Sequence, residues 1–236
     1  QVNIIFPSGA IVDGDKLLIY YGATDTTVGV ATVLLEPLLD SMLLPRKETC
    51  FKRLTEGALI VPKREKPWEA KAVFNPGAID LDGTIRILYR AMSEDNTSVM
   101  GYAESKDGTS LTYISDEPVY VPRESFEEKR IPNGNSGCED PRLIKVGDTI
   151  YMYYTAYNGV DPWAIAQTHI SEKDFKSRNW KWSKPVLVST PGMEDKDGCL
   201  HPEKVGGKYF LFHRINNFIC GDFGSTPEFK ERSTFK

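Results

Sequence analysis

Two adjacent carboxylic acids, Glu139 and Asp140, stand in the hexapeptide GCEDPR at residues 137–142. Cleaving a glycosidic bond with inversion requires one group to protonate the leaving oxygen while water or phosphate attacks the opposite face. Asp140 is the candidate proton donor. Glu139 beside it raises the pKa of Asp140 by disfavouring a second negative charge, whereas Arg142 lowers that pKa and orients the Asp140 carboxyl group. The hexapeptide alone is more typical of an ordinary turn with a salt-bridged arginine.

Polar residues suited to holding sugar hydroxyls occur at the ends of other β-rich runs. Asn75, directly before a Pro-Gly pair, has an amide that donates and accepts hydrogen bonds, and Arg90 donates charge-assisted ones. Asp25 ends the run YYGATD and adds acceptor oxygens. The alternatives are an Asx turn at Asn75, a surface ion pair at Arg90 and a turn cap at Asp25.

A cluster of cations around few carboxylates lies toward the C-terminus. It comprises Lys196, Asp197, the run from His201 to Lys204, His213 and Arg214. Glu203 is a candidate general base that would activate water. Lys204, His213 and Arg214 are candidates for holding phosphate instead. No metal site is predicted, because the spacing of His201 and His213 fits no common set of ligands.

Repeated hairpins predict the elements that position these side chains. Short β-rich runs follow turns of the Asp-Gly, Gly-Asp or Gly-Gly type and recur roughly every 60 to 70 residues, as expected for repeated all-β units. The runs span 16–21, 84–90, 149–154 and 208–213, and apolar partner strands precede three of them at 9–12, 77–81 and 143–146. A β-propeller is expected, with a β-sandwich as the alternative, and only 34–44 has helical character.

Composition excludes several classes of function. The net charge of -4 comes from mixed charges without a long block of one sign, so no nucleic acid or anionic membrane is expected as a partner. The longest apolar runs, 30–35 and 209–212, are far shorter than the ~20 residues of a membrane helix, and no signal-peptide pattern occurs. The sequence therefore predicts a soluble protein.

The four cysteines are widely spaced and form no CxxC pair. This arrangement argues against a zinc site and against a dense disulfide framework. A cytoplasmic location is favoured, and a secreted or periplasmic mature form remains the alternative.

Six motifs, in one order along the chain, resemble glycoside hydrolase family 130, the β-mannoside phosphorylases and hydrolases. They are FNPGAI from Phe74, LYRA from Leu88, GCEDPR from Gly137, YTAY from Tyr154, HPEK from His201 and HR at His213. GCEDPR followed by YTAY is the most specific, whereas HR alone carries no information. The resemblance implies a five-bladed β-propeller that cleaves β-mannosidic bonds with inversion.

The motif order departs from that of the family. FPSGAIV from Phe6 and YYGATD from Tyr20 resemble a segment that stands near the family's C-terminus. We therefore expect one propeller domain over 1–236, in which 1–45 resembles the family's closing segment and 58–236 its N-terminal blades. A circular permutation and a remnant of a preceding repeat both explain this order. About four blades are visible in this sequence. In the family, a further blade's worth of chain follows the HR motif.

An incomplete propeller has consequences for function and assembly. The alternative to an enzyme is a non-catalytic propeller that retains at most sugar binding, and a protein-interaction scaffold is a third, generic interpretation. Open strand edges pair readily with other chains. We therefore expect a homo-oligomer.

The resemblance also implies roles for single residues. Asp140 matches the family's proton donor, which acts through a sugar hydroxyl, and Asp25 matches a residue that binds the mannosyl hydroxyls. The expected substrate-binding residues are Asn75, Arg90, Glu139, Arg142, Asp25, Trp163 and Tyr157. The expected substrate is a β-mannoside oligosaccharide. No cofactor is expected, and inorganic phosphate is the co-substrate if the protein is a phosphorylase.

Trp163 bears on the choice between phosphate and water. Phosphorylases of the family carry an arginine on the strand after YTAY that helps to grip phosphate, and Trp163 stands at the corresponding place in DPWAIA. An indole cannot replace a guanidinium as an anion clamp. Trp163 would instead stack on a sugar ring or pack between blades. The sequence therefore favours a hydrolase or a weakened phosphorylase.

Overall fold

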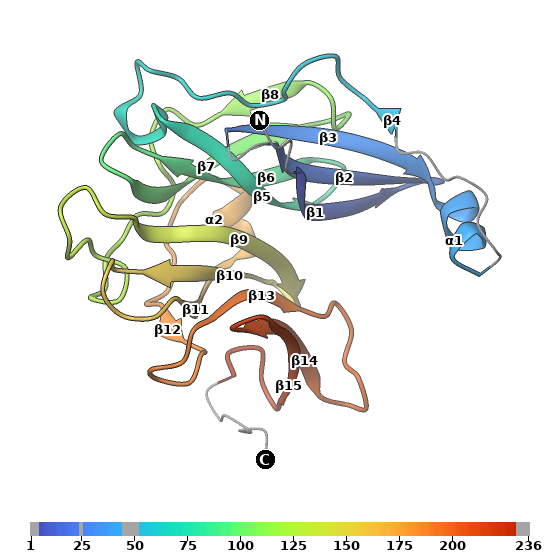
Figure 1. Cartoon of the computed structure of the whole chain (residues 1–236). Coiled ribbons are helices and arrows are strands. Elements are labelled where there is room, and N and C mark those ends of the chain that lie inside the picture. The colour runs from blue at the N-terminus through green and yellow to red at the C-terminus, as the bar shows by residue number, and fades with distance from the viewer. Residues whose placement is uncertain (1–4, 24–25, 44–51, 230–236) are drawn as a thin grey trace.

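The computed structural model describes residues 5–23, 26–43 and 52–229, and these residues form mainly antiparallel β-structure (Figure 1). Within these ranges the chain runs through four successive meanders. The first consists of β1 (Ile5–Asp13), β2 (Lys16–Ala23), β3 (Thr27–Leu34) and β4 (Lys52–Arg53). The second consists of β5 (Ala72–Asp80), β6 (Ile85–Met92), β7 (Thr97–Ser105) and β8 (Leu111–Ile114).

The third and fourth meanders continue the same pattern. The third consists of β9 (Ser136–Val146), β10 (Thr149–Tyr157), β11 (Ala164–Ser171) and β12 (Val186–Leu187). The fourth has β13 (Asp195–Leu200), β14 (Tyr209–Ile215) and β15 (Phe218–Gly224). A short parallel pairing of β7 with β9 joins the second and third meanders into one eight-stranded sheet.

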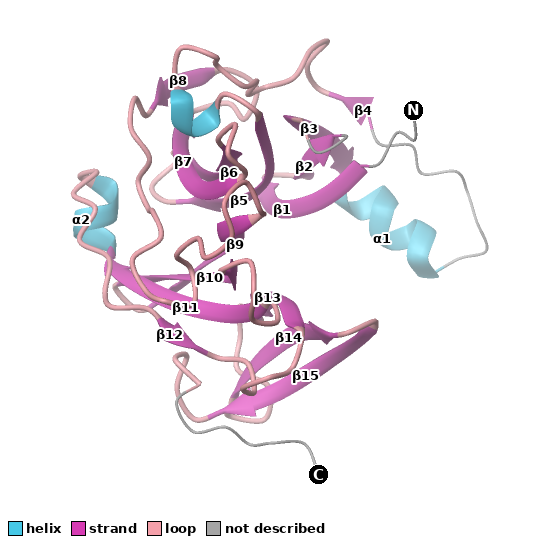
Figure 2. Cartoon of the chain, turned by 60° about the vertical axis from the view of Figure 1, so that its left-hand side comes forward, coloured by secondary structure: helices cyan, strands magenta, loops and turns pink. Residues whose placement is uncertain are grey.

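The first strand of each meander lies on the inside of the arrangement. Strand β5 contacts both β1 and β9, and β9 in turn contacts β13. Figure 2 shows the meanders following one another from β1–β8 at the top to β13–β15 at the bottom. This is the arrangement of propeller blades around their inner strands. The all-β prediction is confirmed, whereas the number of blades and the closure of the ring stay predictions.

Hydrophobic clusters fill the spaces between neighbouring meanders. Fully buried members include Tyr20 and Ile87 between the first and second, Met100 and Met152 between the second and third, and Tyr153 and Ile165 in the cluster between the third and fourth. Each such side chain contributes about 1.5–3 kcal/mol through its removal from water. Packing between meanders therefore holds the inner strands in place.

The predicted hairpins are confirmed. Their second strands are β2, β6, β10 and β14, and the three apolar partner strands lie in or overlap β1, β5 and β9. The predicted helical stretch at 34–44 contains α1 (Leu35–Leu43). The 3-10 turn η1 (Pro67–Glu69) and α2 (Glu172–Lys176) were not predicted, because elements so short show no helical period. No helix in the described ranges has both the length and the apolar character needed to cross a membrane.

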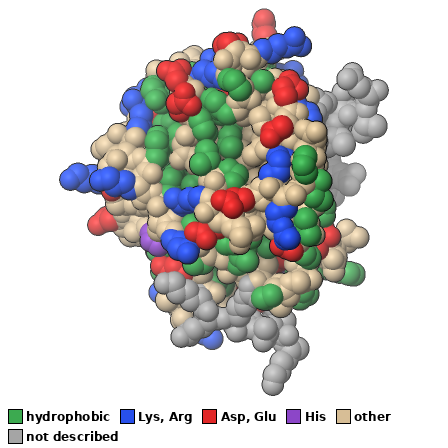
Figure 3. All heavy atoms as spheres, turned by 90° about the vertical axis from the view of Figure 1, so that its left-hand side faces the viewer, with side chains coloured by type: hydrophobic (Ala, Val, Ile, Leu, Met, Phe, Trp, Pro, Cys, Tyr) green, Lys and Arg blue, Asp and Glu red, His purple; other side chains and the backbone are tan. Residues whose placement is uncertain are grey.

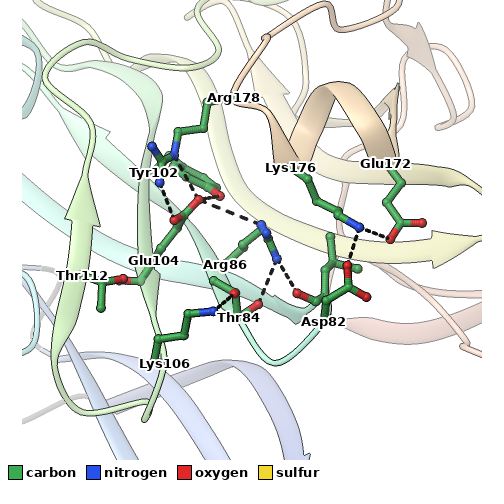
Figure 4. A network of polar contacts seen from close by, with 11 residues as sticks. Asp82, Thr84, Arg86, Tyr102, Glu104, Lys106, Thr112, Glu172, Lys176 and Arg178 are labelled. Atoms are coloured by element: carbon green, nitrogen blue, oxygen red, sulfur yellow. Dashed lines mark hydrogen bonds and ion pairs between the residues drawn. The ribbon is translucent and has the colours of Figure 1, made fainter.

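A polar network ties α2 and the segment after it to the second meander (Figure 4). Arg178 holds Glu104 with two hydrogen bonds, from Nη2 to Oε2 at 2.6 Å and from Nε to Oε1 at 3.1 Å. The hydroxyl of Tyr102 donates to the same Oε1 at 2.6 Å. Lys176 forms an ion pair with Asp82. These contacts fix the second and third meanders relative to each other.

Charged side chains of both signs lie next to one another on the face shown in Figure 3, beside an area of hydrophobic side chains. No broad field of one sign is visible on the described part of that face. This agrees with the mixed charge pattern of the sequence.

Candidate active site

Bulges in the inner strands shape the centre of the arrangement. The pairing is irregular between Pro7 and Gly9 in β1, Phe74 and Gly77 in β5, Glu139 and Arg142 in β9, and Lys196 and Cys199 in β13. Asn75, Asp140 and Asp197 lie in three of these bulges with φ values of 46°, 52° and 60°. Asn and Asp tolerate this left-handed region better than most residues. The bulges therefore redirect one polar side chain from each of three neighbouring strands.

Asp140 is held from two other strands. Its Oδ1 accepts a hydrogen bond from Asn75 Nδ2 at 3.0 Å and another from Arg90 Nη1 at 3.2 Å. Within the described residues, Oδ2 has no hydrogen-bond partner. The carboxyl group is therefore oriented through one oxygen, and the other oxygen is the one that can present a proton to a ligand.

Arg90 uses all three of its guanidinium nitrogens in this group. Its Nε donates to Ser98 Oγ at 2.9 Å, and its Nη2 lies 2.9 Å from Glu139 Oε1. Its guanidinium also lies over the ring of Phe74, with 4.5 Å between the guanidinium carbon and the ring centroid. Arg90 therefore bridges both carboxylates of the GCEDPR motif and is itself held rigidly.

Glu139 is buried next to Asp140, and its electrostatic surroundings are mixed. Burial raises the pKa of Glu139, Arg90 opposes this rise, the negative charge of Asp140 adds to it, and Lys196 opposes it, with a raised pKa as the result. Burial and the neighbouring carboxylate therefore outweigh the two cations at Glu139.

Arg142 does not make the contact that its place in the motif suggested. Its Nη1 donates to the backbone carbonyl oxygens of Asp140 and Pro141, at 3.3 and 3.1 Å, instead of to the Asp140 carboxylate. Residues two apart share a face of a regular strand, but the bulge in β9 breaks that alternation. Arg90 orients the Asp140 carboxylate in its place. Arg142 still supports the bulge through the backbone.

The candidate phosphate ligands on β14 are already partnered. His213 is 5% exposed, and its Nδ1 lies 3.0 Å from Asp195 Oδ1. Its Nε2 lies 3.4 Å from Asp222 Oδ2, which is an ion-pair distance without hydrogen-bond geometry. Arg214 Nε donates to Asp197 Oδ2 at 2.6 Å. Their role in binding phosphate stays a prediction.

His213 predicts a pH dependence of stability. Burial lowers the pKa of His213, but the hydrogen bond to Asp195 and the charges of Asp195 and Asp222 outweigh burial, so the pKa is raised. We expect His213 to stabilise the fold relative to a His213→Gln variant below about pH 6.5. The difference in free energy of unfolding between the two proteins should vanish as the pH rises through the raised pKa of His213. Urea unfolding at several pH values measures this difference. A difference that does not change with pH would show that the charge of His213 does not stabilise the fold.

Glu203 and Lys204 lie away from this group. Both are exposed in the turn between β13 and β14, where the backbone of Glu203 contacts His201 Nδ1 and Lys204 Nζ lies 4.6 Å from the Tyr209 ring centroid. Within the described residues, neither Glu203 nor Lys204 contacts Asp140. Their catalytic and phosphate-binding roles stay predictions. Asp25 lies outside the described residues, so its role also stays a prediction.

Tyr157, Trp163 and Lys196 form a second group of contacts. The two rings are stacked, with 4.5 Å between their centroids and 20° between their planes. Lys196 Nζ lies 4.8 Å from the centroid of the Trp163 ring. The sequence placed Lys196 in a cation cluster without a specific role, although it directly precedes the bulge residue Asp197, as Glu139 precedes Asp140.

The structure therefore brings together some predicted site residues and leaves others apart. One contact group consists of Asn75, Arg90, Glu139 and Asp140. Arg142 contacts this group only through the backbone carbonyl oxygen of Asp140. Ser98, which anchors Arg90, was not predicted. It pairs with Met92 on β6, two residues from Arg90, and no signal in the sequence marks it.

Comparison with known proteins yields a family match. The glycoside hydrolase family 130 model, described as β-1,4-mannooligosaccharide phosphorylase, matches residues 1–44 and 45–222. A 1,2-β-oligomannan phosphorylase from Thermoanaerobacter sp. (strain X514) is 35% identical over 176 residues, which are 70% of this chain and 53% of that protein. A β-1,2-mannobiose phosphorylase from the same strain is 34% identical, with 69% and 53% covered. The chain thus spans about half the length of these curated relatives.

Solved structures show the same architecture. A glycosyl hydrolase from Bacteroides ovatus has a TM-score of 0.58 and 26% identity, covering 71% of this chain and 53% of that one. A thermostable family-43 glycoside hydrolase has a TM-score of 0.68 at 16% identity, covering 97% of this chain and 71% of that one. The second likeness extends over almost all of this chain and concerns the fold alone.

Proposed function

This chain belongs to glycoside hydrolase family 130, and from that premise we propose that it cleaves β-mannosidic bonds in mannooligosaccharides by phosphorolysis with inversion. The observation that carries the proposal is the convergence of Asn75 and Arg90 on one oxygen of Asp140. That arrangement leaves the other oxygen for acid catalysis. The curated relatives that match are phosphorylases of β-mannosides, which favours phosphate as the attacking group.

Asp140 would supply the proton for the departing sugar. The oxygen of the glycosidic bond leaves carbon 1 of the mannosyl unit and takes the proton of Asp140, relayed through a sugar hydroxyl as the family resemblance implies. An oxygen of phosphate forms the new bond to carbon 1 from the opposite face, which gives α-mannose 1-phosphate. The proton that phosphate then loses restores Asp140. Phosphate is a co-substrate in this scheme, and no other cofactor is invoked.

Asn75, Arg90 and Glu139 would prepare Asp140 for this step. Asn75 and Arg90 fix its direction through Oδ1, and Glu139 helps to hold Arg90 in place through the guanidinium Nη2 at 2.9 Å. The proposal also includes a five-bladed propeller formed as one domain, in keeping with the arrangement of the inner strands.

Hydrolysis is the second candidate, because Trp163 replaces the arginine expected in a phosphorylase. Glu203 would then activate water, although its side chain is exposed and, within the described residues, does not contact Glu139 or Asp140. The two reactions differ in their need for phosphate and in their products.

Product analysis with and without phosphate tests the proposal. We expect the chain to release α-mannose 1-phosphate from β-1,2- or β-1,4-mannobiose only when phosphate is present. Equal release of free mannose in both conditions would establish hydrolysis instead. Absence of any product would favour a non-catalytic propeller that binds sugars at most.

A further inference from the structure

We propose that Gly22 on β2 is a positioning residue for Asp140 and acts through the side-chain amide of Asn75. Because Gly22 has no side chain, it leaves the space that this amide fills, and the amide in turn holds the Asp140 carboxyl group in its direction. The inference rests on the proposed cleavage and gives the first meander a part in it. This role needs no contact between Gly22 and a substrate.

Gly22 lies at a close approach of β2 to β5. A Cβ atom added to Gly22 would lie 2.6 Å from Asn75 Oδ1 and 3.0 Å from the backbone nitrogen of Asn75. Non-bonded carbon atoms prefer separations of about 3.5–4.0 Å, so a side chain at this position would displace the amide. Gly22 does not have the positive φ that favours glycine. The position therefore requires glycine for its small size.

The backbone of Gly22 has little freedom to move away from β5. Strand β2 lies between β1 and β3, where Gly22 pairs with Phe6 on one side and Val28 on the other. Gly22 and Val28 are both buried. An added methyl group would therefore displace the Asn75 amide more readily than it would shift β2.

The Asn75 amide spans the space from Gly22 to Asp140. Its Oδ1 lies against Gly22, and its Nδ2 donates to Asp140 Oδ1 at 3.0 Å. The side chain is buried, and within the described residues its Oδ1 has no hydrogen-bond partner. A single hydrogen bond leaves the amide able to tilt. The contact with Gly22 therefore limits the orientation of the amide and, through it, that of Asp140.

The other hydrogen bond to Asp140 does not depend on Gly22. Arg90 donates to the same Oδ1 at 3.2 Å and has two further polar contacts of its own. A Cβ atom on Gly22 would lie 3.4 Å from Phe74 Cβ, which is an ordinary contact, so the ring next to Arg90 would keep its place. A change at Gly22 would therefore reach Asp140 through Asn75.

The test compares turnover in Gly22→Ala with turnover in Gly57→Ala. Gly57 is exposed, and a Cβ atom there would meet no other atom within 4 Å. We expect the kcat of Gly22→Ala to fall about 10- to 100-fold, because a small displacement of a reacting group has an effect of this size. Gly57→Ala should keep the wild-type kcat, and the KM for phosphate should change less than about twofold in both. A wild-type kcat in Gly22→Ala would overturn the inference.

A variant without the amide shows whether the effect passes through Asn75. In an Asn75→Ala background, Gly22→Ala should lower kcat by less than about threefold, because the displaced group is already absent. An equal loss with and without the amide would show that Gly22 acts through packing alone and would overturn the inference. If Gly22→Ala by itself does not fold, cooperative urea unfolding of Gly22→Ala/Asn75→Ala would uphold the inference, and an unfolded double variant would overturn it.

The side-chain amide signal of Asn75 in a proton–nitrogen correlation spectrum separates this inference from the proposed function. Asn75→Ala identifies the signal by its loss. We expect Gly22→Ala to shift the signal and to speed hydrogen exchange of the amide, whereas Gly57→Ala should change neither. Such a shift in a chain without turnover would uphold the inference and count against the cleavage. Turnover that depends on phosphate, with an unchanged amide signal in Gly22→Ala, would overturn the inference and leave the cleavage standing.

Discussion

Replacing Arg90 with alanine is expected to lower the free energy of unfolding by about 3–5 kcal/mol and to remove measurable cleavage of β-mannosides. The variant leaves Glu139 buried without its charged partner and releases Asp140 from one of its two hydrogen bonds. Breaking a buried ion pair from one side is costly, because the remaining charge is neither hydrated nor compensated. Chemical unfolding and a product assay measure the two effects.

Two further variants make this prediction specific. Arg64→Ala removes an exposed arginine and should leave both stability and activity near wild type. Arg90→Ala/Glu139→Gln removes the uncompensated charge as well, so it should recover part of the lost stability but none of the activity. If the double variant were no more stable than Arg90→Ala, the loss would come from packing and not from the buried charge.

Replacing Glu127 with alanine is expected to cost about 4 kcal/mol or more of stability, although no contact links Glu127 to Asp140 in the described residues. This buried carboxylate accepts hydrogen bonds from the hydroxyls of Tyr120 and Tyr154. It also accepts two from the backbone nitrogens of residues 123 and 124. Its removal leaves the two backbone donors and one of the two hydroxyls without this acceptor, since the hydroxyls, 2.8 Å apart, can still bond to each other. Urea unfolding measures the cost.

Glu128 offers a matched control for this variant. It is the next residue in the chain, carries the same side chain and is exposed. Glu128→Ala should change the free energy of unfolding by less than about 0.5 kcal/mol. Similar losses for Glu127→Ala and Glu128→Ala would show that the buried network contributes little.

Local chemistry made much of the fold predictable from the sequence. Turn residues such as Asp13-Gly14 and Gly147-Asp148 mark the hairpins directly, because they suit a tight reversal between strands. Asn75, Arg90 and Asp140 were each identified from residue type, motif and position. Their meeting in space required neighbouring inner strands, which the repeat pattern implied.

Other features depend on geometry that the residue order does not display. The bulge in β9 turns the Asp140 carboxylate toward Arg90 and leaves Arg142 on backbone carbonyls. The contact between Lys196 and Trp163 depends on how β13 lies against the residue before β11. A sequence shows neither a change in strand alternation nor the docking of two meanders.

The central claim is that Asp140 is the acid in a phosphorolytic cleavage. The most direct measurement is the rate of α-mannose 1-phosphate release from β-1,2-mannobiose in phosphate by the wild type, Asp140→Asn and the exposed control Asp148→Asn. Asparagine keeps an oxygen for Asn75 and Arg90 but cannot give up a proton, so we expect a rate at least about 100-fold lower in Asp140→Asn and an unchanged rate in Asp148→Asn. An Asp140→Asn variant that retains most of the wild-type rate would contradict the account.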